Sequence, residues 1–150
     1  MTETVLIYIE KDHKYLMLHR NKKENDYNEG FWIGVGGHIE ANETPDETLV
    51  REVKEETGLT LLGYKKRGIV YFKNEDFEEA MHLYTSSFFK GELIDCDEGE
   101  LNWVDIEQLS HLNMWAGDKE FLSLLANGED YFEIRLIYKG KELIDSIRLK

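Results

Sequence analysis

The most constraining stretch of this chain runs from Gly37 to Leu59 and reads GHIEANETPDETLVREVKEETGL. It contains the start and stop signals of one α-helix. Thr44 can cap the N-terminus, Pro45 suits the first helical position, and Glu47 completes a T-x-x-E capping box. Gly58 offers the left-handed backbone conformation that ends many helices. The sequence therefore predicts a helix between Thr44 and Gly58.

Three glutamates share one side of this predicted helix. Glu52, Glu55 and Glu56 stand at positions i, i+3 and i+4, within a stripe about 100° wide. Each like-charged i,i+4 pair opposes folding by about 0.2–0.5 kcal/mol. A divalent cation such as Mg²⁺ reverses this repulsion, because it binds carboxylate oxygens. The alternative is a solvated acidic face that Arg51 and Lys54 partly compensate.

The other side of the helix is suited to packing. Leu49, Val50 and Val53 project about 100° or more from the middle of the acidic stripe, so the helix can pack and present carboxylates at once. Gly36 and Gly37 lie just before it, and glycines let backbone carbonyls approach a ligand or metal closely. Both features favour a metal or ligand site at this helix.

The same stretch resembles the Nudix box, G-x5-E-x7-R-E-U-x-E-E-x-G-U, in which U is an aliphatic residue. Every defined position is filled, by Gly37, Glu43, Arg51, Glu52, Val53, Glu55, Glu56, Gly58 and Leu59. In the Nudix family this box is a loop–helix–loop that binds divalent metal and cleaves nucleoside diphosphates linked to another moiety. The resemblance implies that residues 1–150 form a single domain with the Nudix fold, an α/β/α sandwich with a mixed β-sheet.

The resemblance also implies a Mg²⁺ site, which Mn²⁺ could fill instead. By analogy with the family, the ligands are the carboxylates of Glu52, Glu55 and Glu56 and the backbone carbonyl of Gly36. Clustered carboxylates raise one another's pKa, so one of them can act as a base once the metal is bound. We expect Glu52 to take that role.

Family members commonly add an acidic metal ligand from a loop beyond the box. In the segment DCDEGELNW, Glu98 precedes a glycine and stands five residues before Trp103, which resembles the family pattern best. Glu100 is the alternative ligand. A third interpretation is a solvated acidic loop without a metal role.

Basic residues near the box have two expected roles. Arg51 is expected to orient Glu52 or Glu43 through a salt bridge, for which a bidentate guanidinium is suited. Arg20 and Lys23 belong to the only compact basic cluster before the box and are expected to bind the phosphates of a substrate. The alternative for Lys23 is a solubilising surface charge.

Beyond the box, the chain is similar to MutT-type enzymes that sanitise the nucleotide pool. The supporting segments are 32–37 and 113–118. In the animal members a tryptophan stacks on the base and nearby aspartates hydrogen-bond the purine edge. Trp115 and Asp118 match such positions, and their chemistry is apt, with an aromatic face for stacking and a carboxylate for a purine N–H. The alternative for Trp115 is a core or hinge residue.

Three positions depart from the animal sanitising enzymes. Ile33 stands where they have asparagine, Gly117 precedes a single aspartate where they have two, and His38 replaces a lysine found in many members. The expected reaction is Mg²⁺-dependent hydrolysis of oxidised purine nucleoside triphosphates, such as 8-oxo-dGTP, to monophosphate and pyrophosphate. The alternatives are a Nudix hydrolase of an ADP-sugar, a dinucleoside polyphosphate or another nucleoside triphosphate, and a non-catalytic nucleotide-binding sensor.

Charge and composition limit the partners. The net charge of −13 disfavours long nucleic acids, since binding a phosphate backbone needs a basic track. No apolar run approaches the roughly 20 residues of a membrane span. The N-terminus lacks the basic region of a secretory signal, and a lone Cys96 cannot form an intrachain disulfide, so we expect a cytoplasmic protein. A monomer and a homodimer both remain compatible with the sequence.

The rest of the chain predicts a mixture of strands and short helices. A polar loop over residues 21–30 leads to an aromatic and glycine-rich segment, and residues 74–79 form an acidic turn. Strands are predicted at residues 4–10, 15–20, 61–72, 81–90, 101–104, 131–138 and 143–149, and helices at 106–112 and 118–126.

Overall fold

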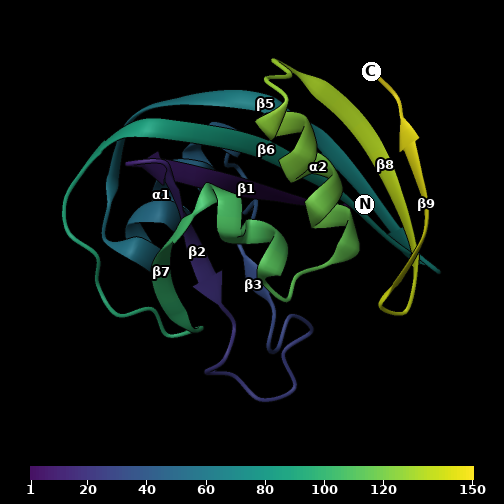
Figure 1. Ribbon diagram of the computed structural model, residues 1–150, viewed down its shortest axis with the longest axis horizontal. Helices are drawn as coiled ribbons and strands as arrows, with labels where there is room; N and C mark the ends of the chain where they lie inside the picture. Colours follow the sequence, from purple (N-terminus) through teal and green to yellow (C-terminus); the bar gives the residue numbers. More distant parts are fainter.

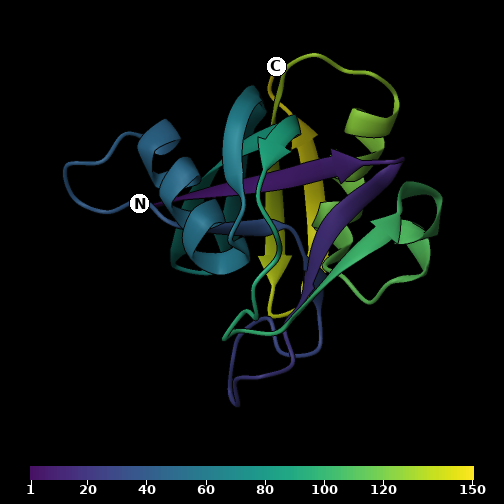
Figure 2. The ribbon, with the colours of Figure 1, turned by 90° about the vertical axis from the view of Figure 1, so that its left-hand side faces the viewer.

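The computed structural model describes residues 1–150 as a mixed β-sheet with a helix on each side (Figure 1). Seen from the side, α1 and α2 flank the sheet, so the predicted α/β/α sandwich is confirmed (Figure 2). No helix combines the length and the apolar character needed to cross a membrane. The elements are β1 (Thr2–Lys11), β2 (Lys14–His19), β3 (Trp32–Ile33), β4 (Val35–His38), α1 (Pro45–Thr57), β5 (Thr60–Asn74), β6 (Phe77–Lys90), β7 (Glu100–Asp105), the 3₁₀ helix η1 (Ile106–His111), α2 (Ala116–Ala126), β8 (Phe132–Lys139) and β9 (Glu142–Arg148).

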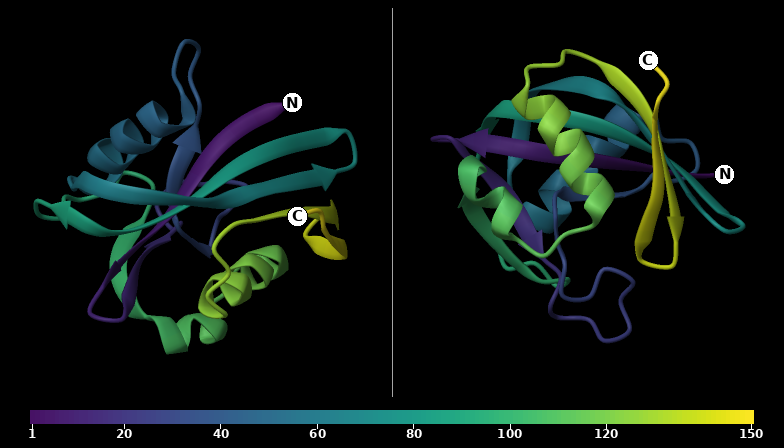
Figure 3. Two further views of the ribbon diagram at one scale, coloured as in Figure 1. Left: turned by 90° about the horizontal axis from the view of Figure 1, so that it is seen from above. Right: turned by 45° about the vertical axis from the view of Figure 1, so that its right-hand side comes forward.

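The sheet forks at β1. Its main path runs β3-β2-β1-β6-β5-β8-β9, while β4 pairs with β1 and β7 pairs with β2. The pairs β1–β6 and β5–β8 are parallel, and the other pairs are antiparallel. Residues 4–7 of β1 bond to β4, whereas only the last two residues of β1 pair with β2. The fork therefore brings β4 next to α1, on the side of the sheet opposite α2 (Figure 3).

The predicted elements are present, with shifted ends. The β5–β6 hairpin turns at 75–76 alone, so the expected acidic turn over 74–79 is too long, because the strands pair as far as Asn74 and Phe77. The expected helix at 106–112 is a 3₁₀ helix that ends at His111. Helix α2 begins at Ala116, two residues earlier than predicted. In the β1–β2 turn, Asp12 and His13 have φ of 51° and 62°, as a two-residue type I′ turn requires.

The glycine-rich segment before α1 is a strand, which the sequence did not predict. Gly36 pairs with Leu6 of β1, and a Cβ on Gly36 would overlap the carbonyl oxygen of Val5. A side chain is therefore excluded at this position because the two strands approach closely. The strand is held by its ladder with β1 and by the fully buried Val35, so it is an ordered edge of the site.

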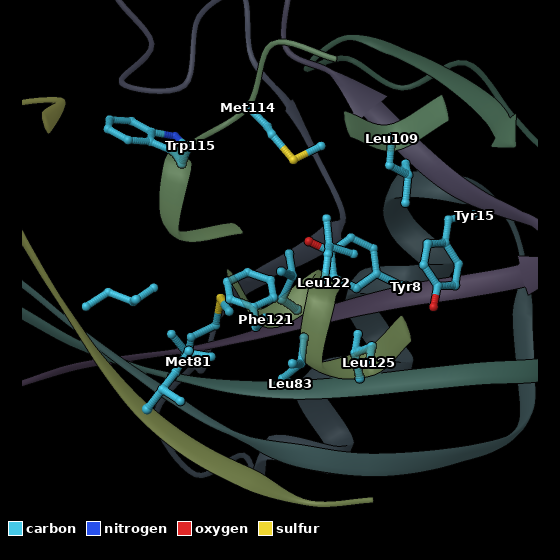
Figure 4. Close-up of a cluster of buried hydrophobic side chains, with 14 of the residues drawn as sticks. Tyr8, Tyr15, Met81, Leu83, Leu109, Met114, Trp115, Phe121, Leu122 and Leu125 are labelled. Carbon is cyan, nitrogen blue, oxygen red and sulfur yellow. The ribbon is translucent and has the colours of Figure 1, made fainter. Parts of the chain in front are cut away.

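Two hydrophobic clusters fill the two sides of the sheet. The larger cluster has 17 buried residues and lies on the α2 side, where Figure 4 shows many of its members. The smaller cluster has 10 buried residues and includes Leu49 and Val53 of α1. Val50, expected to pack with them, is 37% exposed, because it lies at the edge of the buried stripe. The burial of Leu49 and Val53 fixes the rotation of α1 against the sheet.

Candidate active site

Helix α1 is capped at both ends by its own sequence. The Glu47 amide donates to Thr44 Oγ1 at 3.1 Å, and the Thr44 amide donates to Glu47 Oε1 at 2.9 Å, so the predicted capping box is confirmed. Gly58 takes the left-handed conformation with φ of 83°. These caps, together with the packing of Leu49 and Val53, hold the glutamate face of α1 next to β4.

Glu56 lies deepest in the glutamate cluster. Its Oε2 atom is buried and has no hydrogen-bond partner. Burial raises the pKa of Glu56 to about 9, with further contributions from the charges of Glu98 and Glu52, while a hydrogen bond from the Gly36 backbone opposes the rise. A buried carboxyl with a free oxygen and acidic neighbours is an unfavourable arrangement that a bound cation would relieve.

Glu52 lies directly against the backbone of β4. A Cβ on Gly37 would come within 2.5 Å of the Glu52 carboxyl carbon, so only glycine leaves room for this carboxylate. Burial raises the pKa of Glu52, and the hydrogen bond and charge of Arg51 oppose the rise. The two glycines of β4 thus have different roles. Gly36 allows the close approach of β1, and Gly37 leaves room for the Glu52 carboxylate.

The Gly36 carbonyl faces the same cluster. In an antiparallel pair, each residue directs its N–H and C=O to the same side of the strand. The Gly36 N–H is directed to Glu56. Its carbonyl oxygen therefore leaves the strand on the same side, and its role as a metal ligand stays a prediction.

The structure separates the two candidate glutamates of the β6–β7 loop. The charge of Glu98 raises the pKa of both Glu56 and Glu52, so Glu98 lies near these two carboxyls. Glu100, at the start of β7, is exposed and accepts a hydrogen bond from Asn21 Nδ2 at 3.0 Å. Only Glu98 therefore lies with the carboxylates of α1.

Arg51 connects three carboxylates. Its Nε and Nη2 donate to the two oxygens of Glu43 at 2.8 and 2.9 Å, and its Nη1 donates to Glu52 at 3.0 Å and to Glu55 at 3.1 Å. The expected salt bridges to Glu52 and Glu43 are both present. The Arg51 guanidinium, helped by the Thr48 hydroxyl, lowers the pKa of Glu43 to about 2. Glu55 is 60% exposed and bonded to Arg51, so it lies on the solvent side of the cluster.

The acidic cluster fits a divalent metal in its chemistry. As the side chains stand, no three His, Cys, Asp or Glu residues form a closed set of metal ligands. One region nevertheless contains three carboxylates, which are hard oxygen donors. They are Glu56 with its unpartnered oxygen, Glu52 in the space left by Gly37, and the adjacent Glu98. A cation there would supply the missing partner of Glu56 and offset the repulsion among the carboxylates.

Basic side chains lie at the edge of this cluster. Arg20 follows β2 directly, and its Nη1 is 3.4 Å from Glu98, while its Nε donates to Asp26 at 2.7 Å. Lys23 Nζ is also 3.4 Å from Glu98. Sequence reasoning missed Asp26, whose only signal was its place in the polar loop between β2 and β3. Both predicted phosphate-binding residues therefore lie next to the predicted metal ligands.

Trp115 is buried beneath the loop between β2 and β3. It is 8% exposed, and its ring stacks on Tyr27 with centroids 5.0 Å apart and planes at 22°. Its Nε1 donates to Asn28 Oδ1 at 2.8 Å. The indole is packed against the protein, so stacking on a base would require Tyr27 to move. The sequence did not single out Tyr27 or Asn28.

Asp118 lies in the first turn of α2 and is 7% exposed. Burial raises its pKa to about 7, and the charge of Glu79 adds to the rise. Gly117 before it has no room for a side chain, since a Cβ would meet the Tyr138 hydroxyl at 2.5 Å. The missing second aspartate of the sequence therefore has a steric reason. Asp118 is on the α2 side of the sheet, whereas the carboxylates of α1 are on the other side.

The chain is similar to several known proteins. An oxidized purine nucleoside triphosphate hydrolase of Danio rerio is 33% identical over 98 residues, covering 64% of this chain and 63% of that protein. An ADP-ribose pyrophosphatase of Methanocaldococcus jannaschii is 47% identical over 97 residues, covering 65% of this chain and 52% of that protein. The crystal structure of a mutator MutT protein from Bacillus halodurans superposes with a TM-score of 0.90 at 24% identity, covering 99% of this chain and 97% of the other.

The last of these similarities establishes the fold, and the two enzymes have different substrates by name. The family itself is identified by a match to the sequence over most of its length. The model of the NUDIX domain matches residues 2–125, which include β1, the capped helix α1 with its glutamates, and most of α2. The chain therefore belongs to the Nudix hydrolases, a family that acts on phosphoanhydride bonds.

Proposed function

We propose that this protein hydrolyses oxidised purine nucleoside triphosphates of the 8-oxo-dGTP type to the monophosphate and pyrophosphate, and thereby sanitises the nucleotide pool of the cytoplasm. The observation that carries the proposal is that Trp115 and the buried Asp118 lie three residues apart at the start of α2, where the Asp118 amide donates to the Trp115 carbonyl at 3.0 Å. An aromatic ring and a carboxyl in one turn suit the face and the edge of a purine. The similarity to the Danio rerio hydrolase supports the same substrate class.

The acidic cluster would hold the metal, which we propose to be Mg²⁺, with Mn²⁺ as a substitute. Its ligands would be Glu52, Glu56, Glu98 and the carbonyl of Gly36, with Glu55 on the exposed side of the cluster. Bound Mg²⁺ neutralises phosphate charge and lowers the pKa of a water molecule. Nudix hydrolases generally use such divalent ions.

The protein groups would share the remaining tasks. Glu52 would accept the proton of the attacking water, and Arg51 would orient Glu52 by the hydrogen bond of 3.0 Å. Arg20 and Lys23 would exchange their contacts with Glu98 for contacts with the substrate phosphates. These roles use groups that already meet at one edge of the sheet.

A nucleotide panel with Mg²⁺ tests the proposal. The purified protein is expected to prefer 8-oxo-dGTP over dGTP, ADP-ribose and dinucleoside polyphosphates, and to release pyrophosphate. Glu56→Gln is expected to lose at least about a hundredfold in rate, the usual cost of removing one preorganised electrostatic group. A clear preference for ADP-ribose would overturn the proposed substrate. An unchanged rate of Glu56→Gln would overturn the proposed metal site.

A second candidate is an ADP-sugar substrate, favoured by the similarity to the Methanocaldococcus jannaschii enzyme. It predicts that Asp118→Ala and Trp115→Ala leave turnover of ADP-ribose untouched. The third candidate is a nucleotide sensor without catalytic activity. It predicts that Glu56→Gln retains nucleotide binding and that the wild-type protein has no hydrolase activity with any member of the panel.

A further inference from the structure

A second acidic side chain, Glu79 of β6, faces the same region as Asp118. Successive residues of a strand alternate between the two faces of a sheet. Glu79 is two residues before Met81, which belongs to the larger hydrophobic cluster on the α2 side. Thr4 likewise precedes Leu6 by two residues on β1, and its hydroxyl donates to Glu79 Oε2 at 2.7 Å. Glu79 is thus oriented by Thr4 toward the α2 side.

Helix α2 turns Asp118 toward that region. Asp118, Phe121, Leu122 and Leu125 stand at positions i, i+3, i+4 and i+7, which form one face of a helix. The three apolar residues belong to the same cluster as Met81, and Figure 4 shows them between the sheet and α2. Asp118 extends this face at its N-terminal end, so it also points at the sheet.

The region contains polar groups without partners. Tyr8 of β1 is fully buried, and its hydroxyl has no hydrogen-bond partner. Burial raises the pKa of Tyr8 well above its ordinary value, and the charge of Asp118 is the next cause, so the phenol and the carboxyl are neighbours. Only burial and the charge of Glu79 act on the pKa of Asp118, and no hydrogen bond stabilises the charged carboxyl. An unpartnered buried polar group destabilises the folded protein.

Two neighbouring buried carboxyls can act as one hydrogen-bond donor and one hydrogen-bond acceptor. Burial raises the pKa of both carboxyls, and the charge of Glu79 raises that of Asp118 further, so protonation of Asp118 beside an ionised Glu79 is favoured. The protonated carboxyl can then donate a hydrogen bond, while the ionised one accepts. The position before Asp118 cannot contribute a group of its own, since Tyr138 leaves no room for a side chain on Gly117.

We propose that Glu79 and Asp118 together read the hydrogen-bonding edge of a purine, one carboxyl accepting from a ring N–H and the other donating to the adjacent carbonyl oxygen. Such an edge, with a donor beside an acceptor, is present in guanine and its 8-oxo derivative. The inference rests on the proposed nucleotide substrate and deepens it. It adds Glu79, a residue of β6 outside the Nudix box, as a determinant of base specificity.

Binding of 8-oxo-dGMP tests the role of Glu79 without turnover. Affinities are measured by calorimetry in buffer with a chelator, for the wild-type protein and for Glu79→Gln. The amide can no longer act as an ionised acceptor, so about a tenfold weaker affinity is expected, equivalent to about 1.4 kcal/mol. Glu78→Gln is the matched control, because Glu78 faces the other side of β6 and pairs with Lys73 at 3.6 Å. It is expected to bind like the wild type.

A modified ligand separates recognition from a structural role. 8-oxo-dGMP methylated at N1 lacks the N–H that the carboxyl pair would bind, so it is expected to bind weakly and equally to the wild type and Glu79→Gln. If Glu79→Gln weakens both ligands equally, or weakens neither, the inference is wrong. Thr4→Val gives a second variant that leaves the carboxyl in place and removes the hydroxyl that orients it. It is expected to weaken 8-oxo-dGMP binding by roughly threefold, the loss of one modest hydrogen bond.

The inference and the proposed substrate can fail separately. A wild-type protein that hydrolyses a different nucleotide and ignores 8-oxo-dGTP would refute the substrate. The monophosphate released from that nucleotide then replaces 8-oxo-dGMP, and Glu79→Gln is compared with Glu78→Gln in the same way. Equal affinities of the two variants would refute the role of Glu79.

Discussion

Arg51 Nη1 donates to Glu52 Oε1 at 3.0 Å, while the other side of the same guanidinium holds both oxygens of Glu43. The planar group thus joins the loop before α1 to a carboxylate on its glutamate face. A lysine has the same charge but cannot make this set of directed bonds. The orientation of Glu52 therefore depends on an arginine at this position.

Arg51→Lys is expected to lower kcat by about 10- to 100-fold, the usual effect of disturbing a residue that orients a metal ligand. Arg135→Lys is the control, since Arg135 is an exposed residue of β8. Steady-state kinetics with Mg²⁺ and a thermal melt of each variant give the measurement. A kcat of Arg51→Lys within twofold of the wild type would contradict the orienting role.

Glu98 and Glu100 allow a direct test of the loop ligand. Glu98→Gln removes a carboxylate near Glu56 and is expected to weaken Mg²⁺ binding and activity by about tenfold or more. Glu100→Gln only alters a hydrogen bond with Asn21 and is expected to have a much smaller effect. Titration with Mn²⁺, followed by electron paramagnetic resonance, measures the metal affinity directly. The reverse order of effects would assign the ligand to Glu100.

Tyr27→Ala is expected to uncover the indole of Trp115, because the Tyr27 ring covers one face of it at 5.0 Å. The tryptophan emission should shift to longer wavelength, and acrylamide should quench it more strongly. Trp115→Phe identifies the part of the signal that comes from this residue. Tyr131→Ala, at an exposed tyrosine distant in sequence, is the control. An unchanged spectrum would mean that Tyr27 does not cover Trp115 in solution.

Asp118 should make the stability of the metal-free protein depend on pH. Its pKa is raised to about 7 in the folded protein, chiefly by burial, from an ordinary value of 3.8. The folded state therefore binds more protons than the unfolded state between these pH values, so the free energy of unfolding falls as pH rises through this window. Below it, both states are protonated and the contribution of Asp118 is fully present.

Urea unfolding of the wild type and of Asp118→Asn at pH 4, 5.5, 7 and 8 measures this effect. The asparagine does not titrate, so the difference in stability between the two proteins should change with pH and level off above about pH 7. A difference that stays constant over the whole range would show that Asp118 titrates as an ordinary exposed carboxyl. Asp145→Asn, at an exposed position of β9, is the control variant.

The box helix was predictable because its determinants are local. Thr44, Glu47 and Gly58 satisfy backbone groups within a few residues of themselves, so the sequence alone defines the ends of α1. The spacing of Glu52 and Glu56 follows from the helical period. These features need no knowledge of the rest of the chain, and the structure confirms the helix and its caps.

The remaining parts of the site depend on contacts between distant segments. The β2–β7 ladder pairs His19 with Glu100 and leaves Glu98 just before the strand, beside Glu56. Glu79 meets the α2 side only through the parallel pairing of β1 with β6, and Tyr27 covers Trp115 from a loop 88 residues away in sequence. The hydrophobic period within one segment does not tell which residues of distant segments lie side by side.

The sequence by itself determined the family, the capped helix and the glutamate stripe, because these follow from residue spacing within one short segment. The tertiary structure alone decided which glutamate of the β6–β7 loop joins the stripe and which acidic group faces Asp118. The physical reason is that burial and strand register arise from packing the whole sheet, and both set the charge environment of every carboxyl in the site.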